Sequence, residues 1–174
     1  MRVDAGLLAC LQRLLVVFSI LMPASAHAND EVVQAPDYEI AQIRLTPANS
    51  STPIAFSVKL SVTPSQHAFG LMFSPPLPAK SGMLFVFEDN KPRTFWMKNT
   101  PIALDMLFFD DSGRLVSLIS NAKPNTLTLL HSRVAVRYVL EIGGLEASRL
   151  NIKIGSRLHL PIAIIGNKAQ LRKK

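Results

Sequence analysis

The sequence predicts a mainly β domain: a sandwich or barrel of short, mostly antiparallel strands with one or two short helices. Turn signals rich in Pro, Gly, Asn, Asp and Ser recur about every ten residues, as they do in sandwiches and barrels. Residues 55–62 alternate strictly between apolar and polar side chains, which is typical of a strand with one solvated face. No segment has the pattern of a long amphipathic helix, so we expect few helices.

The first 28 residues are predicted to be a secretory signal peptide with cleavage after Ala28. Arg2 and Arg13 make the start basic, residues 14–22 form an apolar stretch, and Ala26-His27-Ala28 fits the small-x-small pattern of a cleavage site. An uncleaved membrane anchor is the alternative, but this apolar stretch is too short to span a bilayer comfortably. We therefore expect an exported protein, periplasmic or secreted.

Composition and charge exclude several classes of function. The single Cys, Cys10, lies in the predicted signal peptide, so the mature chain has no thiol for catalysis, redox chemistry or zinc binding. Removal of the signal peptide lowers the formal net charge from +7 to +6, and Lys168, Arg172, Lys173 and Lys174 carry most of this excess. The near-neutral body argues against nucleic acid as a partner. We expect the basic tail to be solvated, with contact to an anionic membrane surface as the alternative.

A single domain is expected at residues 38–166, after an extended leader at 29–37 and before the basic tail at 167–174. Strands are expected at residues 38–45, 55–62, 83–88, 95–98, 102–109, 114–120, 134–142 and near 157–165. The first two flank a turn cluster, so we expect them to pair as a hairpin.

Two short helical segments interrupt the strands. Thr63-Pro64-Ser65-Gln66 is a capping box with Pro at the first helical position, and it predicts a short helix that ends near Gly70 or Phe73. Residues 146–150 are expected to form a single helical turn. Residues 74–82 contain three Pro and are predicted to be a surface loop, and residues 88–93 a turn.

Asp105 raises the main question about function. Apart from this residue both faces of strand 102–109 are apolar, so we expect the strand to be buried on both faces and the carboxyl to be paired, hydrogen-bonded or protonated. In one interpretation, Asp105 holds the corner at residues 98–101 from within. In the other, a polar pocket binds a ligand. The candidate pocket residues are Trp96, Lys98, Asn99, Thr100, Asp105 and Glu141.

Other patterns are weaker. Trp96 lies between apolar neighbours, which favours core packing over a ligand platform, and Asn99-Thr100 is first of all a turn.

The sequence contains no nucleophile elbow, zinc-protease motif or phosphate-binding loop. Thioethers and imidazoles bind Cu(I), but their wide spacing favours core filling; the residues concerned are Met72, Met83, Met97, Met106, His67, His131 and His159.

Five sequence blocks, in one order, closely resemble the domain of unknown function 192 family. They are Gly70-Leu71-Met72-Phe73, Gly82-Met83-Leu84-Phe85-Val86-Phe87, Phe95-Trp96-Met97-Lys98-Asn99-Thr100, Leu104-Asp105 and Tyr138-Val139-Leu140-Glu141. The resemblance covers about residues 38–162 and implies a compact, jelly-roll-like β domain with no established activity. Family members often carry Arg where this chain has Phe69 and Ser74, and a Gly-Asp turn where it has Gly155-Ser156.

We therefore expect an exported, non-enzymatic envelope protein that binds a small ligand or a partner protein and needs no cofactor or metal. One alternative is a hydrolase-like enzyme with a carboxylate–lysine site formed by Asp105, Glu141 and Lys98. The other is a metal-handling protein that uses Met and His side chains.

Overall fold

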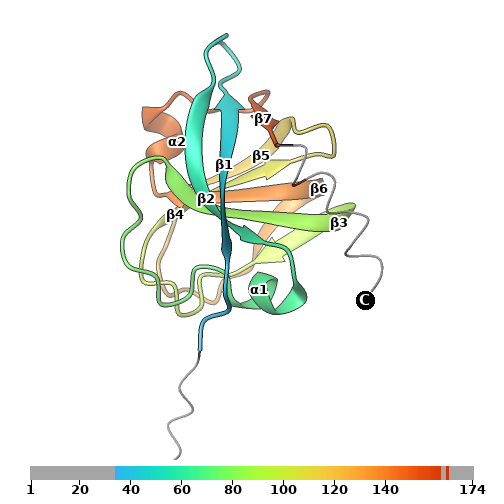
Figure 1. Cartoon of the computed structure of the whole chain (residues 1–174). Helices are drawn as coiled ribbons and strands as arrows, with labels where there is room; N and C mark the ends of the chain where they lie inside the picture. The colour runs from blue at the N-terminus through green and yellow to red at the C-terminus, as the bar shows by residue number, and fades with distance from the viewer. Residues whose placement is uncertain (1–33, 162–163, 165–174) are drawn as a thin grey trace, which may run out of the picture. The chain divides into compact units, whose positions relative to one another are not determined.

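The computed structural model describes residues 34–161 and residue 164, and it confirms a mainly β domain (Figure 1). The seven strands are β1 (Glu39–Thr46), β2 (Ile54–Ser61), β3 (Ser81–Phe95), β4 (Leu104–Phe109), β5 (Leu115–Ala122), β6 (Leu130–Gly143) and β7 (Arg157–His159). The two short helices are α1 (Pro64–Phe69) and α2 (Glu146–Arg149). The expected signal peptide and basic tail lie outside the described residues.

All seven strands form one sheet in the order β5-β4-β6-β3-β2-β1-β7. β1 and β2 pair as the predicted antiparallel hairpin, and every other neighbouring pair is antiparallel except β2 and β3. Parallel neighbours need a crossover connection, and here the connection contains α1 and the Pro-rich loop. Within residues 34–161, no helix is long and apolar enough to cross a membrane.

The sheet curls into a half-barrel whose two edges meet at one end. Arg114, just before β5, forms an isolated antiparallel bridge with Arg157 at the start of β7. The Leu115 amide donates to the Ser156 carbonyl at 2.8 Å, and the Leu158 amide donates to the Gly113 carbonyl at 2.8 Å. These bonds satisfy edge groups that would otherwise remain open to pairing with another chain.

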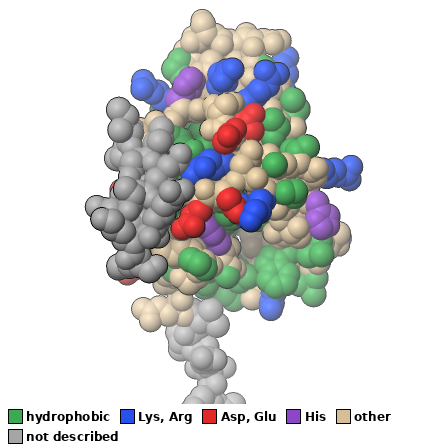
Figure 2. Space-filling model, turned by 90° about the vertical axis from the view of Figure 1, so that its right-hand side faces the viewer, with side chains coloured by type: hydrophobic (Ala, Val, Ile, Leu, Met, Phe, Trp, Pro, Cys, Tyr) green, Lys and Arg blue, Asp and Glu red, His purple; other side chains and the backbone are tan. Residues whose placement is uncertain are grey.

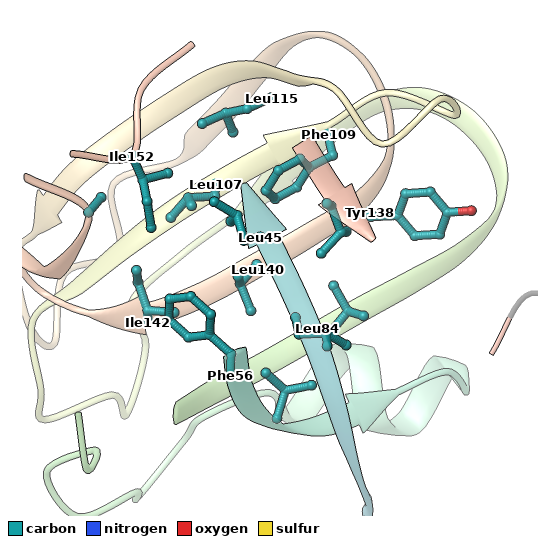
Figure 3. Packing of buried hydrophobic residues seen from close by; sticks show 14 of the residues in the cluster. Leu45, Phe56, Leu84, Leu107, Phe109, Leu115, Tyr138, Leu140, Ile142 and Ile152 are labelled. Carbon is teal, nitrogen blue, oxygen red and sulfur yellow. The ribbon is translucent and has the colours of Figure 1, made fainter. Parts of the chain in front are cut away.

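One apolar cluster, the inner core, lies on the face that the curled sheet encloses (Figure 3). Alternate residues of β6 point into it, namely Tyr138, Leu140 and Ile142. Figure 3 shows them packed with Leu45, Phe56, Leu84, Leu107, Phe109, Leu115 and Ile152. Full burial of each such side chain contributes roughly 1.5–3 kcal/mol, so the inner core is a major source of stability in a domain without disulfides.

A second apolar cluster, the outer core, lies on the opposite face of β3, β4 and β6. It contains Leu71, Met83, Phe85, Met97, Leu104, Met106, Phe108, Ala122, Val136 and Val139. Leu71 and Met97 belong to the segments that follow α1 and β3, so these segments cover the sheet on this side. Because both faces are covered, all six residues of β4 are buried, as the sequence predicts.

The predicted capping box is confirmed. The Gln66 amide donates to Thr63 Oγ1 at 3.3 Å, and Gln66 Oε1 accepts from the Thr63 amide at 3.0 Å. The helix ends at Gly70, whose positive φ of 52° favours glycine. A sequence-local signal therefore sets both ends of α1.

The predicted turn at residues 88–93 is wrong, because β3 continues through it as a strand of 15 residues. The register with β6 shifts between Val86 and Lys91 and again between Pro92 and Thr94, which marks β-bulges. Bulges tolerate Pro in a strand, so turn-forming residues do not end β3 here. Two other strand predictions are too long, since only Phe95 of residues 95–98 is in a strand and β7 has three residues.

The carboxylate of Asp105 is fully buried on β4 and accepts four hydrogen bonds. Oδ1 accepts from Ser120 Oγ at 3.1 Å, the Asn121 amide at 2.7 Å and the Leu145 amide at 3.0 Å. Oδ2 accepts from the Ala147 amide at 2.8 Å. Asn121 and Leu145 have positive φ values of 52° and 64°, so Asp105 bonds to two locally strained positions. It holds β5 and the start of α2, and not the corner at residues 98–101.

We predict that Asp105→Asn lowers the free energy of unfolding by about 2–3 kcal/mol, because an amide cannot accept from all four of these donors. Urea unfolding of the purified mature protein measures the change. Asp111→Asn is the control, since Asp111 is exposed and should tolerate the same substitution. A loss no larger for Asp105→Asn than for the control would contradict this role.

Candidate functional site

A cleft of about 540 Å³ lies on the outer face of the sheet, between α1, the second half of β3 and β6. Its volume is within the range of small-molecule sites. The apolar lining includes Phe69, Leu71, Phe85, Phe87, Phe95, Trp96 and Leu129, and the polar lining includes His67, Arg93, Thr94, Lys98, Thr100 and Glu141. Figure 2 shows the side of the molecule toward α1 and the end of β3, where charged and histidine side chains lie above a gathering of hydrophobic ones.

Aromatic rings from β3 form much of the wall. Phe85 and Phe95 contact edge to face with their ring centroids 5.2 Å apart, an arrangement that aromatic pairs prefer. Trp96 follows directly and is 46% exposed, so its ring stands at the mouth and is not packed in the core. Leu129, also at the cleft, is 54% exposed. The apolar lining therefore continues from the interior to the surface.

Glu141 is a buried acid in this apolar cleft. It lies on β6 with Met83 of β3 and Met106 of β4 as its cross-strand neighbours, and only 4% of it is exposed. Neither a hydrogen bond nor an ion pair reaches its carboxyl group from the described part of the chain. Desolvation by burial raises the pKa of Glu141 to about 8. The carboxyl is therefore mostly protonated at neutral pH.

A glycine permits the close strand pairing beside Glu141. A Cβ atom added to Gly82 of β3 would lie 2.0 Å from the backbone oxygen of Glu141. Gly82 thus lets β3 approach β6 at the position where the acid enters the cleft.

The guanidinium of Arg93 is already paired. It forms an ion pair with the Asp89 carboxylate and donates to the Asp89 carbonyl at 2.7 Å. The same guanidinium lies over the Phe87 ring, 4.0 Å from its centroid. Hydrogen bonds from Lys91 and Arg93 lower the pKa of Asp89 to about 2. The charge of Arg93 is therefore balanced by Asp89, while its buried Nε has no hydrogen-bond partner among the described residues.

His67 and Lys98 complete the polar lining. The ring of His67 lies 4.5 Å from that of Phe87, and its Nε2 is 3.0 Å from the Ser61 carbonyl, to which it donates. Burial lowers the pKa of His67, and its hydrogen bonds to backbone carbonyls offset this only in part. Lys98 is exposed, with its ammonium group 5.4 Å from the centroid of the Trp96 ring.

The structure brings four of the six candidate pocket residues to the cleft: Trp96, Lys98, Thr100 and Glu141. Asn99 is exposed and outside the lining, and its carbonyl accepts from the Phe73 amide at 2.7 Å.

Asp105 lies away from the cleft. It pairs with Ile142, whereas Glu141 pairs with the next residue of β4, Met106. Because successive residues of a strand point to opposite faces, Asp105 and Glu141 lie on opposite sides of the sheet. The expected carboxylate–lysine arrangement of Asp105, Glu141 and Lys98 is not formed.

Several residues that line the cleft were not predicted from the sequence to do so, chiefly His67, Phe69, Phe85, Phe87, Arg93, Phe95 and Leu129. The alternation of Phe85 and Phe87 in strand 83–88 was a usable signal, since both point to one face. That signal is ambiguous in a continuous apolar run, which is also typical of a strand buried on both sides. The approach of α1 to this face has no local signature.

The potential soft-metal ligands lie in different surroundings. Met83, Met97 and Met106 are buried in the outer core, and Met72 lines the cleft. His131 and His159 are exposed and bond to Thr94 and Thr46; the described residues contain no group of three His, Cys, Asp or Glu side chains that could hold a metal ion.

Comparisons with known proteins identify relatives of unknown activity. The sequence profile of the domain of unknown function 192 family, described as "Uncharacterized ACR", matches residues 45–160. No curated protein matches the chain. A Sinorhizobium meliloti protein whose description proposes a transcription regulator is 36% identical, with a TM-score of 0.69, over 72% of this chain and 97% of that one. A Novosphingobium aromaticivorans protein of unknown function is 32% identical, with a TM-score of 0.67, over 74% of this chain and 94% of that one.

The matched residues contain β2 to β7 and every residue that lines the cleft. They make up more than half of the chain. The chain belongs to the domain of unknown function 192 family.

Proposed function

We propose that this protein is a non-enzymatic binding domain that holds a small ligand in the cleft on the outer face of its sheet. One observation carries the proposal: Glu141 is a buried acid at the wall of an aromatic cleft, and no described residue donates a hydrogen bond to its carboxyl group or forms an ion pair with it. Buried polar groups in native proteins are hydrogen-bonded, and each exception requires an explanation. The carboxyl group of Glu141 lines the cleft, so a bound ligand could supply its partner from there.

The surroundings of Glu141 favour binding over catalysis. General acid–base catalysis by a carboxyl group generally uses a second group in reach of the same substrate. Asp105 lies on the other face of the sheet, Arg93 is paired with Asp89, and His67 donates to a backbone carbonyl. The cleft thus offers one acid, with no second carboxyl group among the described residues of its lining.

Transcription regulation, which the description of the Sinorhizobium relative proposes, has less support here. The longer of the two helices in residues 34–161 has six residues, too short for the recognition helix of a major-groove reader. The sequence body is also near neutral once the signal peptide and basic tail are set aside.

We further propose that the protein works outside the cytoplasm, with its ligand drawn from the cell envelope or its surroundings. The basic start, the apolar stretch at residues 14–22 and the small-x-small pattern before Asn29 support this location.

The burial of Glu141 should make the stability of the protein depend on pH. Between its ordinary pKa of 4.5 and the folded-state pKa of about 8, the folded protein binds one proton more than the unfolded chain. The free energy of unfolding should therefore fall as pH rises through this window, by up to about 1.4 kcal/mol per pH unit from this group. Above pH 8 both states have lost the proton and the contribution stays constant.

Glu141→Gln should remove this slope, because the amide does not ionise. Urea unfolding at pH 5, 6, 7 and 8 should show a variant whose stability relative to wild type rises with pH. Glu88→Gln, at an exposed position, is the matched control. Parallel pH profiles for wild type and Glu141→Gln would contradict the burial of an unpartnered acid.

The cleft should also bind an apolar probe. The uncharged fluorophore N-phenyl-1-naphthylamine should bind there and quench Trp96, the single Trp of the chain, by energy transfer. Ala68→Phe places a ring in the cleft from an exposed position on α1, and should weaken binding by at least about tenfold. Ala79→Phe, exposed and outside the lining, is the control. Equal binding by both variants would place the fluorophore elsewhere and remove the cleft as the site.

A further inference from the structure

We propose that the ligand is an organic cation: a small amine whose ammonium group pairs with Glu141 while its apolar body contacts the aromatic walls. This inference rests on the proposed binding function and adds the chemical class of the ligand. It follows from the one acid in the lining, from the rings around it, and from the state of the other charged groups.

Glu141 is the only acidic residue that lines the cleft among the described residues. An ionised carboxylate so little exposed is stable only when a cation or several hydrogen-bond donors face it. The two side-chain cations in the lining do not form an ion pair with it. A ligand ammonium would supply both the opposite charge and the hydrogen bonds.

The walls themselves attract cations. The face of an aromatic ring carries a negative electrostatic potential, which favours an ammonium or guanidinium within about 6 Å of the ring centroid. Two rings of the cleft already hold protein cations in this way, Arg93 over Phe87 at 4.0 Å and Lys98 over Trp96 at 5.4 Å. Three further rings, those of Phe69, Phe85 and Phe95, line the same cleft.

An anionic ligand would find little to bind. The charge of Arg93 is balanced by Asp89, and Lys98 is exposed, so solvent and salt screen its attraction. An anion near Glu141 would also oppose ionisation of the acid. Among the charged groups that line the cleft, the buried one whose charge no described residue balances is Glu141, so the complementary ligand is positive.

The pH dependence of ligand binding should show whether Glu141 is the group that pairs with the ligand. The titratable or charged groups that line the cleft besides Glu141 are His67, Arg93 and Lys98, and Tyr38 lies near enough to Glu141 for the two to interact electrostatically. Burial, with a smaller contribution from Glu141, raises the pKa of Tyr38, and burial lowers that of His67, so Tyr38 stays protonated and His67 mostly neutral between pH 7 and 9. The main charge change expected in this interval is the loss of the Glu141 proton.

A cation binds the ionised form, so its affinity should rise with pH up to the pKa of Glu141, about 8, and then level off. The rise should approach tenfold per pH unit, which makes binding at pH 6 about 100-fold weaker than at pH 9. A ligand that accepts a hydrogen bond from the neutral acid should show the opposite trend.

The experiment compares three probes of one shape: 4-phenylbutylamine, 4-phenylbutanol and 4-phenylbutyrate. Each is titrated into the mature protein at pH 6, 7, 8 and 9, with the emission of Trp96 as the signal. The amine should bind most tightly and gain affinity with pH, and Glu141→Gln should lose both effects. Glu88→Gln, an exposed acid, should behave like wild type.

Tighter binding of the alcohol or the carboxylate, an amine affinity that is flat or falls with pH, or the absence of amine binding would overturn the inference. N-phenyl-1-naphthylamine separates this failure from that of the proposed function. If the fluorophore binds and Ala68→Phe weakens it while the amine fails, the cleft is a binding site for another class of ligand. If neither binds, both proposals fall.

Discussion

The buried carboxylate of Asp105 is the interaction on which the arrangement of the domain depends. Its four hydrogen bonds join β4 to the end of β5, to the N-cap residue of α2 and to α2 itself. Two of the amides belong to residues with positive φ that are not glycine. Such positions persist only where the surroundings hold them, and one carboxylate does this for both. Asp105 thus fixes the positions of β5 and α2 relative to β4 through buried hydrogen bonds.

Asp105 and Glu141 are two buried acids with different roles: Asp105 stabilises the fold, and Glu141 is the proposed ligand-binding group. Both acids are buried, and they lie on adjacent strands one register step apart. The protein satisfies every oxygen of the first and leaves the carboxyl of the second without a partner in the described residues. Successive residues of a strand point to opposite faces of the sheet. A single step in register therefore puts Asp105 among its backbone donors on one face and Glu141 at the cleft on the other.

Local signals in the sequence predicted the hairpin, the capping box of α1 and the burial of β4, because each depends on neighbouring residues. The continuity of β3 could not be predicted, since Pro92 is tolerated only through bulges that the partner strand defines. One of the two interpretations of Asp105 placed it in one pocket with Glu141. Their separation depends on the register of β4 against β6, which no local pattern encodes.

The parallel pairing of β2 and β3 has a consequence for the order of folding. Parallel neighbours cannot form a tight hairpin, so the crossover must close a long loop before α1 can face β3 and β6. Contacts between distant residues form more slowly than local ones. The β1–β2 hairpin is therefore expected early and the cleft late. A cleft assembled last exists only in the complete fold, and its occupant would distinguish finished molecules from partly folded ones.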